Sequence, residues 1–377
     1  MVRFVHTADW QLGMTRHFLD GEAQARFSQA RIEAINKIGR LAEEQDCSFV
    51  VVCGDVFETN HVERQVIVRA LDAMAETPRV AFYLLPGNHD PLNASSVFRS
   101  RTFVDHCPAN VIVLEAEGPT EVYPDVQLVA APWTSKAPLE DLVQRAIAPT
   151  SSGDGIRIAV GHGSVDVLSP DAVNPALIAL KDAEAAIADG RIQYVALGDR
   201  HSMTSVGDTG RVWYPGAPEP TAFREVEPGY VLVVELGGDD ISVEPHAVGR
   251  WTFHSLEADL RGADDIDRLE TTLAEISDKP ESIMQLSVIG QLSLAEKIRF
   301  DALLDHFSDL LASLSIWERH SELAVLPDDD DFASLGLSGF AHDALDDLVA
   351  LAQGDGEDAS AAMDALGLLY RLSGAAT

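Results

Sequence analysis

Cysteine is scarce in this chain of 377 residues, and long apolar segments are missing. The three cysteines, Cys47, Cys53 and Cys107, are odd in number and show no CxxC spacing, which argues against a disulfide framework and a thiolate zinc site. No apolar run approaches the roughly 20 residues that a membrane-spanning helix needs. The first residues enter a predicted strand without a signal-peptide pattern. We therefore expect a cytoplasmic protein with no membrane role.

Basic residues are few, with 27 lysines and arginines against 61 acidic residues and a formal net charge of −34. This balance argues against a nucleic-acid partner, because phosphate contacts need basic side chains. The charge is unevenly spread, since residues 1–110 carry −3, residues 111–250 carry −12 and residues 251–377 carry −19. Bound divalent cations would raise the local potential further. The argument against a nucleic-acid partner is therefore weakest for the N-terminal segment. The acidic C-terminal third is typical of a solvated surface.

The pattern of elements predicts an α/β fold with two further segments. Apolar strands alternate with helical stretches up to about residue 246, which indicates βαβ units and two stacked sheets. The predicted helices are 22–44, 62–75, 139–147 and 176–188, and the predicted later strands, taken as antiparallel additions, are 121–129, 211–214, 230–235 and 241–244. We expect a first domain at 1–249, a small α+β domain at 250–326, and an acidic linker with two short helices at 327–377. Such a helix pair is too small to bury its own apolar faces and should dock on the protein or on a partner.

Five apolar runs end in turns that carry acidic, amide or imidazole side chains. These runs with their turns are residues 4–9, 49–55, 80–90, 156–163 and 194–201. Residues just past the carboxyl ends of strands share one crevice in an open α/β sheet, so these side chains are expected to converge. Each turn alone is a weak signal because Asp is common in turns and helix caps. Five in order indicate a metal site.

A centre of this kind suits the hydrolysis of phosphodiesters. Two metal ions about 3.5–4 Å apart can activate a bridging water and neutralise the phosphate. The candidate ligands are Asp55 as the bridge, Asp9 and His201 for one metal, and Asn88, His162 and Asp199 for the other. His89 is the candidate group that stabilises the transition state or protonates the leaving oxygen, and Asp90 is expected to orient its imidazole.

The same residues carry a family resemblance. The series Asp9, Gly54-Asp55, Gly87-Asn88-His89-Asp90, Gly161-His162 and Gly198-Asp199-Arg200-His201 resembles the calcineurin-like metallophosphoesterases. Within that family, the segments HTADWQLG at 6–13, GDVF at 54–57 and YPGAPEP at 214–220 resemble the DNA repair nucleases of the SbcD or Mre-eleven type. The resemblance covers residues 1 to about 250, and the later module matches that family's capping domain in position and general pattern.

The resemblance implies a two-sheet metallophosphoesterase sandwich flanked by helices, with a small α+β capping domain and a C-terminal helical segment. The implied activity is that of a DNA exonuclease and endonuclease that uses two divalent metal ions. Manganese is the expected metal, with magnesium, iron and zinc as alternatives. The implied partners are DNA, an SMC-like ATPase of the SbcC type, and a second copy of the chain in a homodimer.

Three positions depart from the family pattern. Gln11 stands where the family usually has a histidine two residues after the first aspartate, and its amide oxygen is a weaker metal ligand. Glu58 occupies an accessory position that often holds histidine. Asp199 replaces the first histidine of the last motif and, as a hard oxygen ligand, favours manganese or magnesium.

Two other functions remain open from the sequence. The first is a small-molecule phosphodiesterase or phosphatase on the same scaffold, because a fold does not fix its substrate. The second is a catalytically silent scaffold protein whose metal site has decayed at Gln11 and Asp199.

Overall fold

The computed structural model describes residues 1–171, 173–237, 240–325 and 340–352, together with 358–359, 361–362, 365–366 and 368. The chain forms two compact units, Met1–Trp251 and Thr252–Thr377. No helix within the described ranges is both long and apolar enough to cross a membrane.

The first sheet of the N-terminal unit is mixed, with the strand order β12-β11-β1-β2-β3-β4. The four parallel strands are β1 (Val2–Thr7), β2 (Phe49–Cys53), β3 (Ala81–Leu85) and β4 (Val111–Val113). Two strands continue the sheet antiparallel beyond β1, namely β11 (Tyr230–Gly237) and β12 (Asp240–Ala247).

The second sheet has the strand order β5-β6-β7-β8-β10-β9. Its strands are β5 (Gly118–Tyr123), β6 (Val126–Ala130), β7 (Ile156–His162), β8 (Tyr194–Gly198), β9 (Thr204–Val206) and β10 (Val212–Tyr214). The strands β6, β7, β8 and β10 are parallel to one another, whereas β5 and β9 pair antiparallel with β6 and β10 at the two edges.

Two sequence predictions about this sheet are wrong. The single strand predicted at 121–129 is a hairpin, because Asp125 adopts a left-handed conformation at φ 60° and turns the chain between β5 and β6. The segment at 211–214 was expected to add antiparallel, but β10 pairs parallel with β8 and antiparallel only with β9. Both errors concern pairing partners, which a local apolar pattern does not specify.

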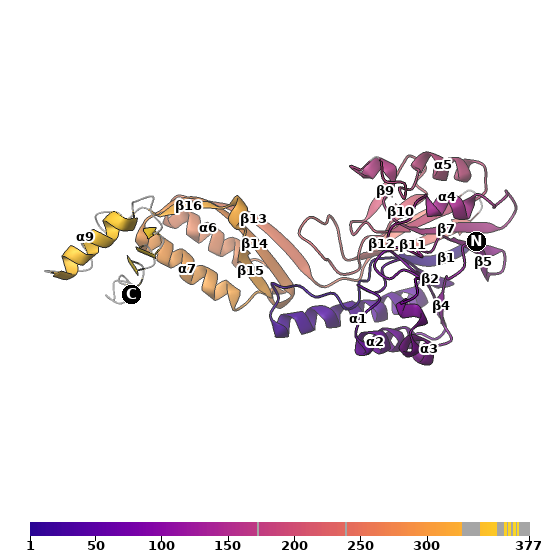
Figure 1. Cartoon of the computed structure of the whole chain (residues 1–377), viewed down its shortest axis with the longest axis horizontal. Coiled ribbons are helices and arrows are strands. Elements are labelled where there is room, and N and C mark those ends of the chain that lie inside the picture. The colour runs from indigo at the N-terminus through magenta and orange to yellow at the C-terminus, as the bar shows by residue number, and fades with distance from the viewer. Residues whose placement is uncertain are drawn as a thin grey trace. The chain divides into compact units, whose positions relative to one another are not determined.

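Successive side chains of a strand point to opposite faces of the sheet, and apolar residues on both faces explain why the two sheets stack between helices. In β2, Val50 and Val52 face one apolar cluster while Phe49 and Val51 face another. The second cluster lies between the two sheets, where Phe49 meets residues of β7 and β8 such as Tyr194. The outer faces are covered by helices on opposite sides, as Figure 1 shows for this unit. The predicted two-sheet sandwich flanked by helices is therefore confirmed.

The covering helices are α1 (Gly21–Glu44), α2 (Arg64–Ala75) and α3 (Arg101–His106) on the first sheet, with α4 (Leu142–Ile147) and α5 (Leu180–Ala188) on the second. Four of these five lie within or next to predicted segments, and α5 begins four residues later than the predicted 176–188. α4 begins three residues later than predicted because the Asp141 side chain caps it by accepting a hydrogen bond from the Gln144 N–H. α3 was not predicted.

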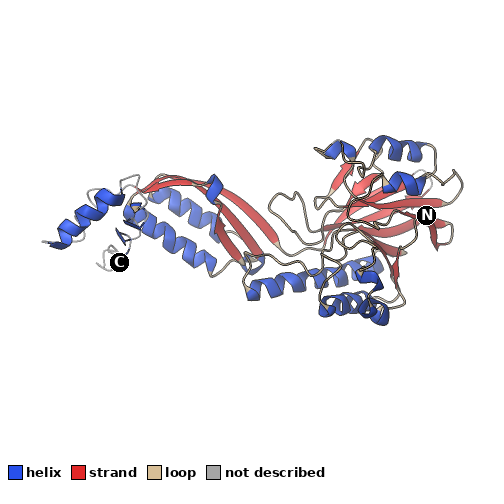
Figure 2. Ribbon diagram, in the orientation of Figure 1, coloured by secondary structure: helices blue, strands red, loops and turns tan. Residues whose placement is uncertain are grey.

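The C-terminal unit contains a four-stranded parallel sheet. Its elements are β13 (Thr252–Leu260), α6 (Ala263–Ala274), β14 (Ser282–Leu292), α7 (Leu294–Ser308), β15 (Ser313–Ile316) and β16 (Glu322–Val325). Leu269 of α6 and Phe300 of α7 pack with Leu286 of β14 in one apolar cluster. Figure 2 shows the helices and strands of this unit. Strands and helices alternate along the chain from β13 to β15, and β16 follows.

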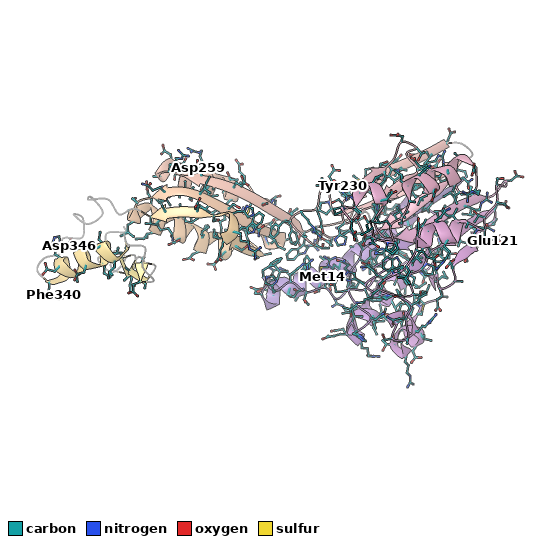
Figure 3. The ribbon with its side chains drawn as sticks, turned by 45° about the horizontal axis from the view of Figure 1, so that its top comes forward. Met14, Glu121, Tyr230, Asp259, Phe340 and Asp346 are labelled. Carbon is teal, nitrogen blue, oxygen red and sulfur yellow. The ribbon has the colours of Figure 1, made fainter. Side chains whose placement is uncertain are left out.

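A further helix, α9 (Phe340–Ala352), lies in the C-terminal unit. Its Leu345 forms a small cluster with Leu294 of α7 and Leu366. Figure 3 labels Phe340 at the start of α9, where 87% of its surface is exposed. The acidic linker expected at the start of 327–377 lies outside the described residues, as does most of the second short helix expected in that segment. The partner-binding role of 327–377 stays a prediction.

Candidate metal centre

The predicted polar turns meet at the carboxyl ends of five parallel strands. β1, β2 and β3 supply three turns from the first sheet, and β7 and β8 supply two from the second. Backbone hydrogen bonds tie neighbouring turns together, since the Asp9 N–H donates to the Gly54 carbonyl at 3.1 Å and the Gln11 N–H donates to the Asp55 carbonyl at 2.9 Å. The turns after β1 and β2 are therefore held side by side by backbone hydrogen bonds.

Asp9, Asp55 and His162 form the innermost part of this site. One ligand atom from each lies within 4.8 Å of the other two, which is a spacing that a metal ion can bridge. Each of the three residues is at most 3% exposed. The group thus combines two strand ends of the first sheet with one of the second.

Asn88 and Asp199 extend the group on the side of His162. The Asn88 carboxamide lies 2.7 Å from His162 Nε2. His162 Nε2 lies 3.4 Å from Asp55 Oδ2 and 3.8 Å from Asp199 Oδ1. The Asp199 N–H also donates to both carboxylate oxygens of Asp9 at 3.1 Å.

His201 and Gln11 extend the group of Asp9, Asp55 and His162 on the side of Asp9. His201 Nε2 lies 3.9 Å from Asp9 Oδ1, and Gln11 Nε2 lies 3.3 Å from His201 Nε2. The structure therefore brings all seven candidate ligands into one connected cluster. That they bind metal stays a prediction.

Both histidines present the same ring nitrogen to the centre. The His162 Nδ1–H donates to the Cys53 carbonyl at 2.8 Å, because that oxygen can only accept. His201 Nδ1 lies 2.9 Å from Glu225 Oε1 and 2.7 Å from Thr221 Oγ1. An acceptor on Nδ1 leaves Nε2 free to bind a metal, as is usual for histidine ligands. Glu225 and Thr221 were missed from the sequence, where no spacing connects them to His201.

The centre concentrates buried negative charge. Burial raises the pKa of Asp9 to about 7, although the nearby His201 and His162 lower it. Burial also opposes the ionisation of Asp55, but the charge and hydrogen bond of His162 outweigh it and hold its pKa below the ordinary value. Buried carboxylates at such short separations call for a cation.

The residues present fit divalent metal ions. Gln11 Oε1 is buried and has no hydrogen-bond partner among the described residues, so it is an oxygen available to a ligand. The remaining donors are three carboxylates, one amide and two imidazoles, a mixture that suits manganese, iron or zinc. Asp55, which contacts both halves of the cluster, has the position expected of a bridging ligand.

The backbone of the site is held in an unusual conformation. Asp9, Gln11, Asp55 and Asp199 all have positive φ, at 54°, 44°, 52° and 96°. Non-glycine residues rarely adopt this conformation, and it costs of order 1–3 kcal/mol each. The surrounding hydrogen bonds therefore hold these ligands in place at the expense of stability.

His89 and Asp90 lie beside the cluster in different environments. His89 Nε2 is 3.9 Å from Asp55 Oδ2, and its Nδ1–H donates to the Glu58 carbonyl at 2.9 Å. The Asp90 carboxylate instead accepts hydrogen bonds from the backbone N–H groups of Gly87 and Phe57 at 2.7 and 2.9 Å. The prediction that Asp90 orients the His89 imidazole is wrong. The Glu58 carbonyl accepts the hydrogen bond of that imidazole, and Asp90 instead stabilises the backbone of the turn.

A cavity of about 410 Å³ opens above the cluster. Its lining includes Gln11, Asp55, His89, Asp199, His201 and Arg224. The candidate ligands from both sheets thus face a common space that has the volume of a ligand site.

A model of the calcineurin-like phosphoesterase family matches residues 2–233. The chain therefore belongs to the calcineurin-like phosphoesterase family. Membership of the family implies a metal-dependent hydrolase whose cofactors are divalent metals.

Several curated relatives are similar to the chain. The SbcD component of the nuclease SbcCD from Rhodobacter capsulatus is 26% identical over 286 residues, which are 63% of this chain and 67% of that protein. The protein of the same name from Escherichia coli is 26% identical over 310 residues, 71% of this chain and 75% of that one.

Among solved structures, TT1561 of Thermus thermophilus has a TM-score of 0.41 at 11% identity, covering 66% of this chain and 99% of that one. A dimetal phosphatase from Danio rerio has a TM-score of 0.39 at 14% identity, covering 66% and 96%.

Replacing Glu225 with glutamine is expected to weaken the binding of one metal ion roughly tenfold, because the His201 imidazole loses its carboxylate acceptor. Titration calorimetry with Mn²⁺ measures the effect. Glu227→Gln, an exposed side chain two residues further along, is the matched control. Equal affinities for the two variants would contradict the role of Glu225.

Removing metal with a chelator is expected to lower the melting temperature more at pH 8 than at pH 6. In the metal-free protein the pKa of Asp9 is about 7, against an ordinary 3.8. Between these values the folded chain keeps a proton that the unfolded chain has released, so stability falls as the pH rises from about 4 to 7. Above pH 7 a bound cation would offset the buried charge of Asp9 and restore stability. Thermal scans with and without chelator at both pH values test this, and an equal or larger metal effect at pH 6 would refute it.

Proposed function

We propose that the chain is a DNA exonuclease and endonuclease that depends on two divalent metal ions, preferably manganese. One observation carries the proposal: seven polar residues from five strand ends lie in one cluster around Asp55. The relatives named as components of a nuclease support DNA as the substrate.

The cluster has separate parts for holding metals and for moving a proton. Asp9, Gln11 and His201 would hold one ion, Asn88, His162 and Asp199 the other, and Asp55 both. Bound there, the pair would supply a nucleophilic hydroxide and neutralise the charge of the phosphate.

His89 lies just outside the cluster, and 36% of its side chain is exposed. The Glu58 carbonyl holds its Nδ1–H, which turns Nε2 toward the centre. From there, His89 can carry a proton to the leaving oxygen.

A nuclease assay tests the proposal directly. The full chain is expected to release nucleotides from single- or double-stranded DNA with Mn²⁺ and to lose this activity with a chelator. His89→Asn is expected to keep two bound metal ions while lowering the rate roughly 10²-fold or more. His106→Asn, on exposed α3, is the matched control. Absence of DNA cleavage with every divalent metal tried would refute the proposal.

The proposal extends to an SbcC-type ATPase and to a homodimer. The resemblance to the SbcD type supports both, and the names of the relatives, which are components of SbcCD, support the ATPase. Pull-down with the full chain and with a chain ending at Pro327 compares their capture of the ATPase. Equal capture would refute a role of the C-terminal helices, and a monomeric mass in solution would refute the dimer.

The acidic composition favours a second candidate, a small-molecule phosphodiesterase or phosphatase. This function predicts hydrolysis of nucleotide esters in Mn²⁺ with no cleavage of DNA.

A further inference from the structure

Two arginines on the wall of the cavity, Arg200 and Arg224, form no ion pair with any residue in the described ranges. Both are exposed. Several other arginines of this acidic chain pair with carboxylates, as in Arg99 with Glu115, Arg145 with Glu140 and Arg261 with Asp259. Two cations without acidic partners beside the candidate metal centre therefore call for an explanation.

Both arginines are next to residues of the centre in the sequence. Arg200 lies between Asp199 and His201, and Arg224 directly precedes Glu225. The Arg200 Nε–H donates to Thr204 Oγ1 at 2.8 Å, which steadies its guanidinium. Both arginines therefore line the cavity, and each lies on a segment that also carries a residue of the centre.

The acidic side chains next to these arginines in the sequence, Asp199 and Glu225, face other partners. Glu225 contacts His201 through Oε1 at 2.9 Å and accepts the Thr221 N–H through Oε2 at 2.8 Å. Asp199 Oδ1 faces His162 Nε2 at 3.8 Å. The positive charge of the two arginines thus remains available to an anion that enters the cavity.

We infer that Arg200 and Arg224 bind the phosphates on either side of the scissile phosphate in a nucleic-acid strand. This inference rests on the proposed function and narrows it to a polynucleotide substrate. A guanidinium binds a phosphate through two parallel N–H groups, and such contacts position a strand without reading its sequence. They also explain how a chain of net charge −34 receives a polyanion, because the basic groups stand at the point of entry.

A binding experiment tests the inference without turnover. The probe is a fluorescent single-stranded phosphorothioate oligonucleotide, which keeps the backbone charge and resists hydrolysis, in the presence of Mn²⁺. Arg200→Gln and Arg224→Gln are each expected to weaken binding roughly fivefold to tenfold, and to reduce the slope of log affinity against log salt by about 0.7. Arg79→Gln is the matched control, because Arg79 is exposed and precedes β3 at the end opposite the centre.

Two binding results would overturn the inference. The first is binding by both arginine variants that is as tight as that of the wild-type chain. The second is a loss of binding in Arg79→Gln as large as theirs, since the effect would then be one of net charge.

Hydrolysis of bis(4-nitrophenyl) phosphate separates the inference from the proposed function. This ester has a single phosphate and no flanking one, so both arginine variants are expected to lose much less kcat/KM on it than they lose in affinity for the oligonucleotide. An equal loss on this ester and on the oligonucleotide would overturn the inference, because the arginines would then act on the centre itself. A wild-type chain that hydrolyses the ester but neither binds nor cleaves oligonucleotides would instead refute DNA as the substrate.

Discussion

Asp55→Asn is expected to reduce phosphodiester hydrolysis by roughly 10³-fold or more and to lower the bound metal from two equivalents to one or fewer. Asp55 is 2% exposed, and its carboxylate faces His162 at 3.4 Å and His89 at 3.9 Å. A neutral amide has one oxygen in place of two and no negative charge to hold a pair of cations. The rate and the metal content of the purified protein measure the effect.

The fold should survive this substitution. Asp55 Oδ1 accepts the His89 N–H at 2.9 Å, and an asparagine oxygen can accept the same bond. The melting temperature in chelator is expected to fall only modestly, because the substitution keeps this hydrogen bond but removes the charge interaction with His162 that lowers the pKa of Asp55. Asp72→Asn, on the exposed side of α2, is the matched control. Two metal equivalents or wild-type rates in Asp55→Asn would show that Asp55 bridges nothing.

Gly198→Ala is expected to destabilise the N-terminal unit by about 3 kcal/mol, which is a fall in melting temperature of roughly 6–12 °C. A Cβ at this position would lie 1.9 Å from the Cys53 carbonyl oxygen, 2.8 Å from Ala8 Cβ and 2.9 Å from His162 Nδ1. The carbonyl is backbone and cannot rotate away, so the two sheets would have to move apart at the centre. Thermal unfolding measures the loss, and a drop in metal affinity should accompany it.

Gly21→Ala is the control for this substitution. Nothing lies within 4 Å of a Cβ built on Gly21, which begins α1, and alanine favours a helix over glycine. Its melting temperature is expected to equal or slightly exceed that of wild type. Equal melting temperatures for the two alanine variants would mean that the sheets tolerate a methyl group at Gly198.

The strand ends were predictable because their signal is local. A short apolar run with alternating faces identifies a buried strand, as in 49–53, and a polar turn directly after it places Asp55 at the carboxyl end. The same reasoning placed Asp9, Asn88 and His162. Parallel pairing then brings Asp9, Asp55 and Asn88 to one edge of the first sheet, and His162 lies at the carboxyl end of a parallel strand of the second.

The partners of these residues were not predictable in the same way. Glu225 reaches His201 across 24 positions, and the Glu58 carbonyl reaches His89 across 31. Asp90 was assigned to His89 because they are neighbours in the sequence, yet it accepts from the Phe57 N–H instead. Side-chain type does not encode which loop lies beside another, since loop paths depend on packing between elements.

The sequence by itself determined the chemical groups, their order along the chain and their place at strand ends, because alternation and turn composition are properties of a few consecutive residues. Only the tertiary structure decided that the two sheets are in close contact at Gly198, and that Nε2 of His162 and of His201 faces the centre. It also decided that Arg200 and Arg224 lie on the cavity wall without acidic partners among the described residues. These features follow from contacts between segments far apart in the sequence. Such contacts are fixed by the close packing of Phe49, Tyr194 and their neighbours between the sheets, which no local pattern contains.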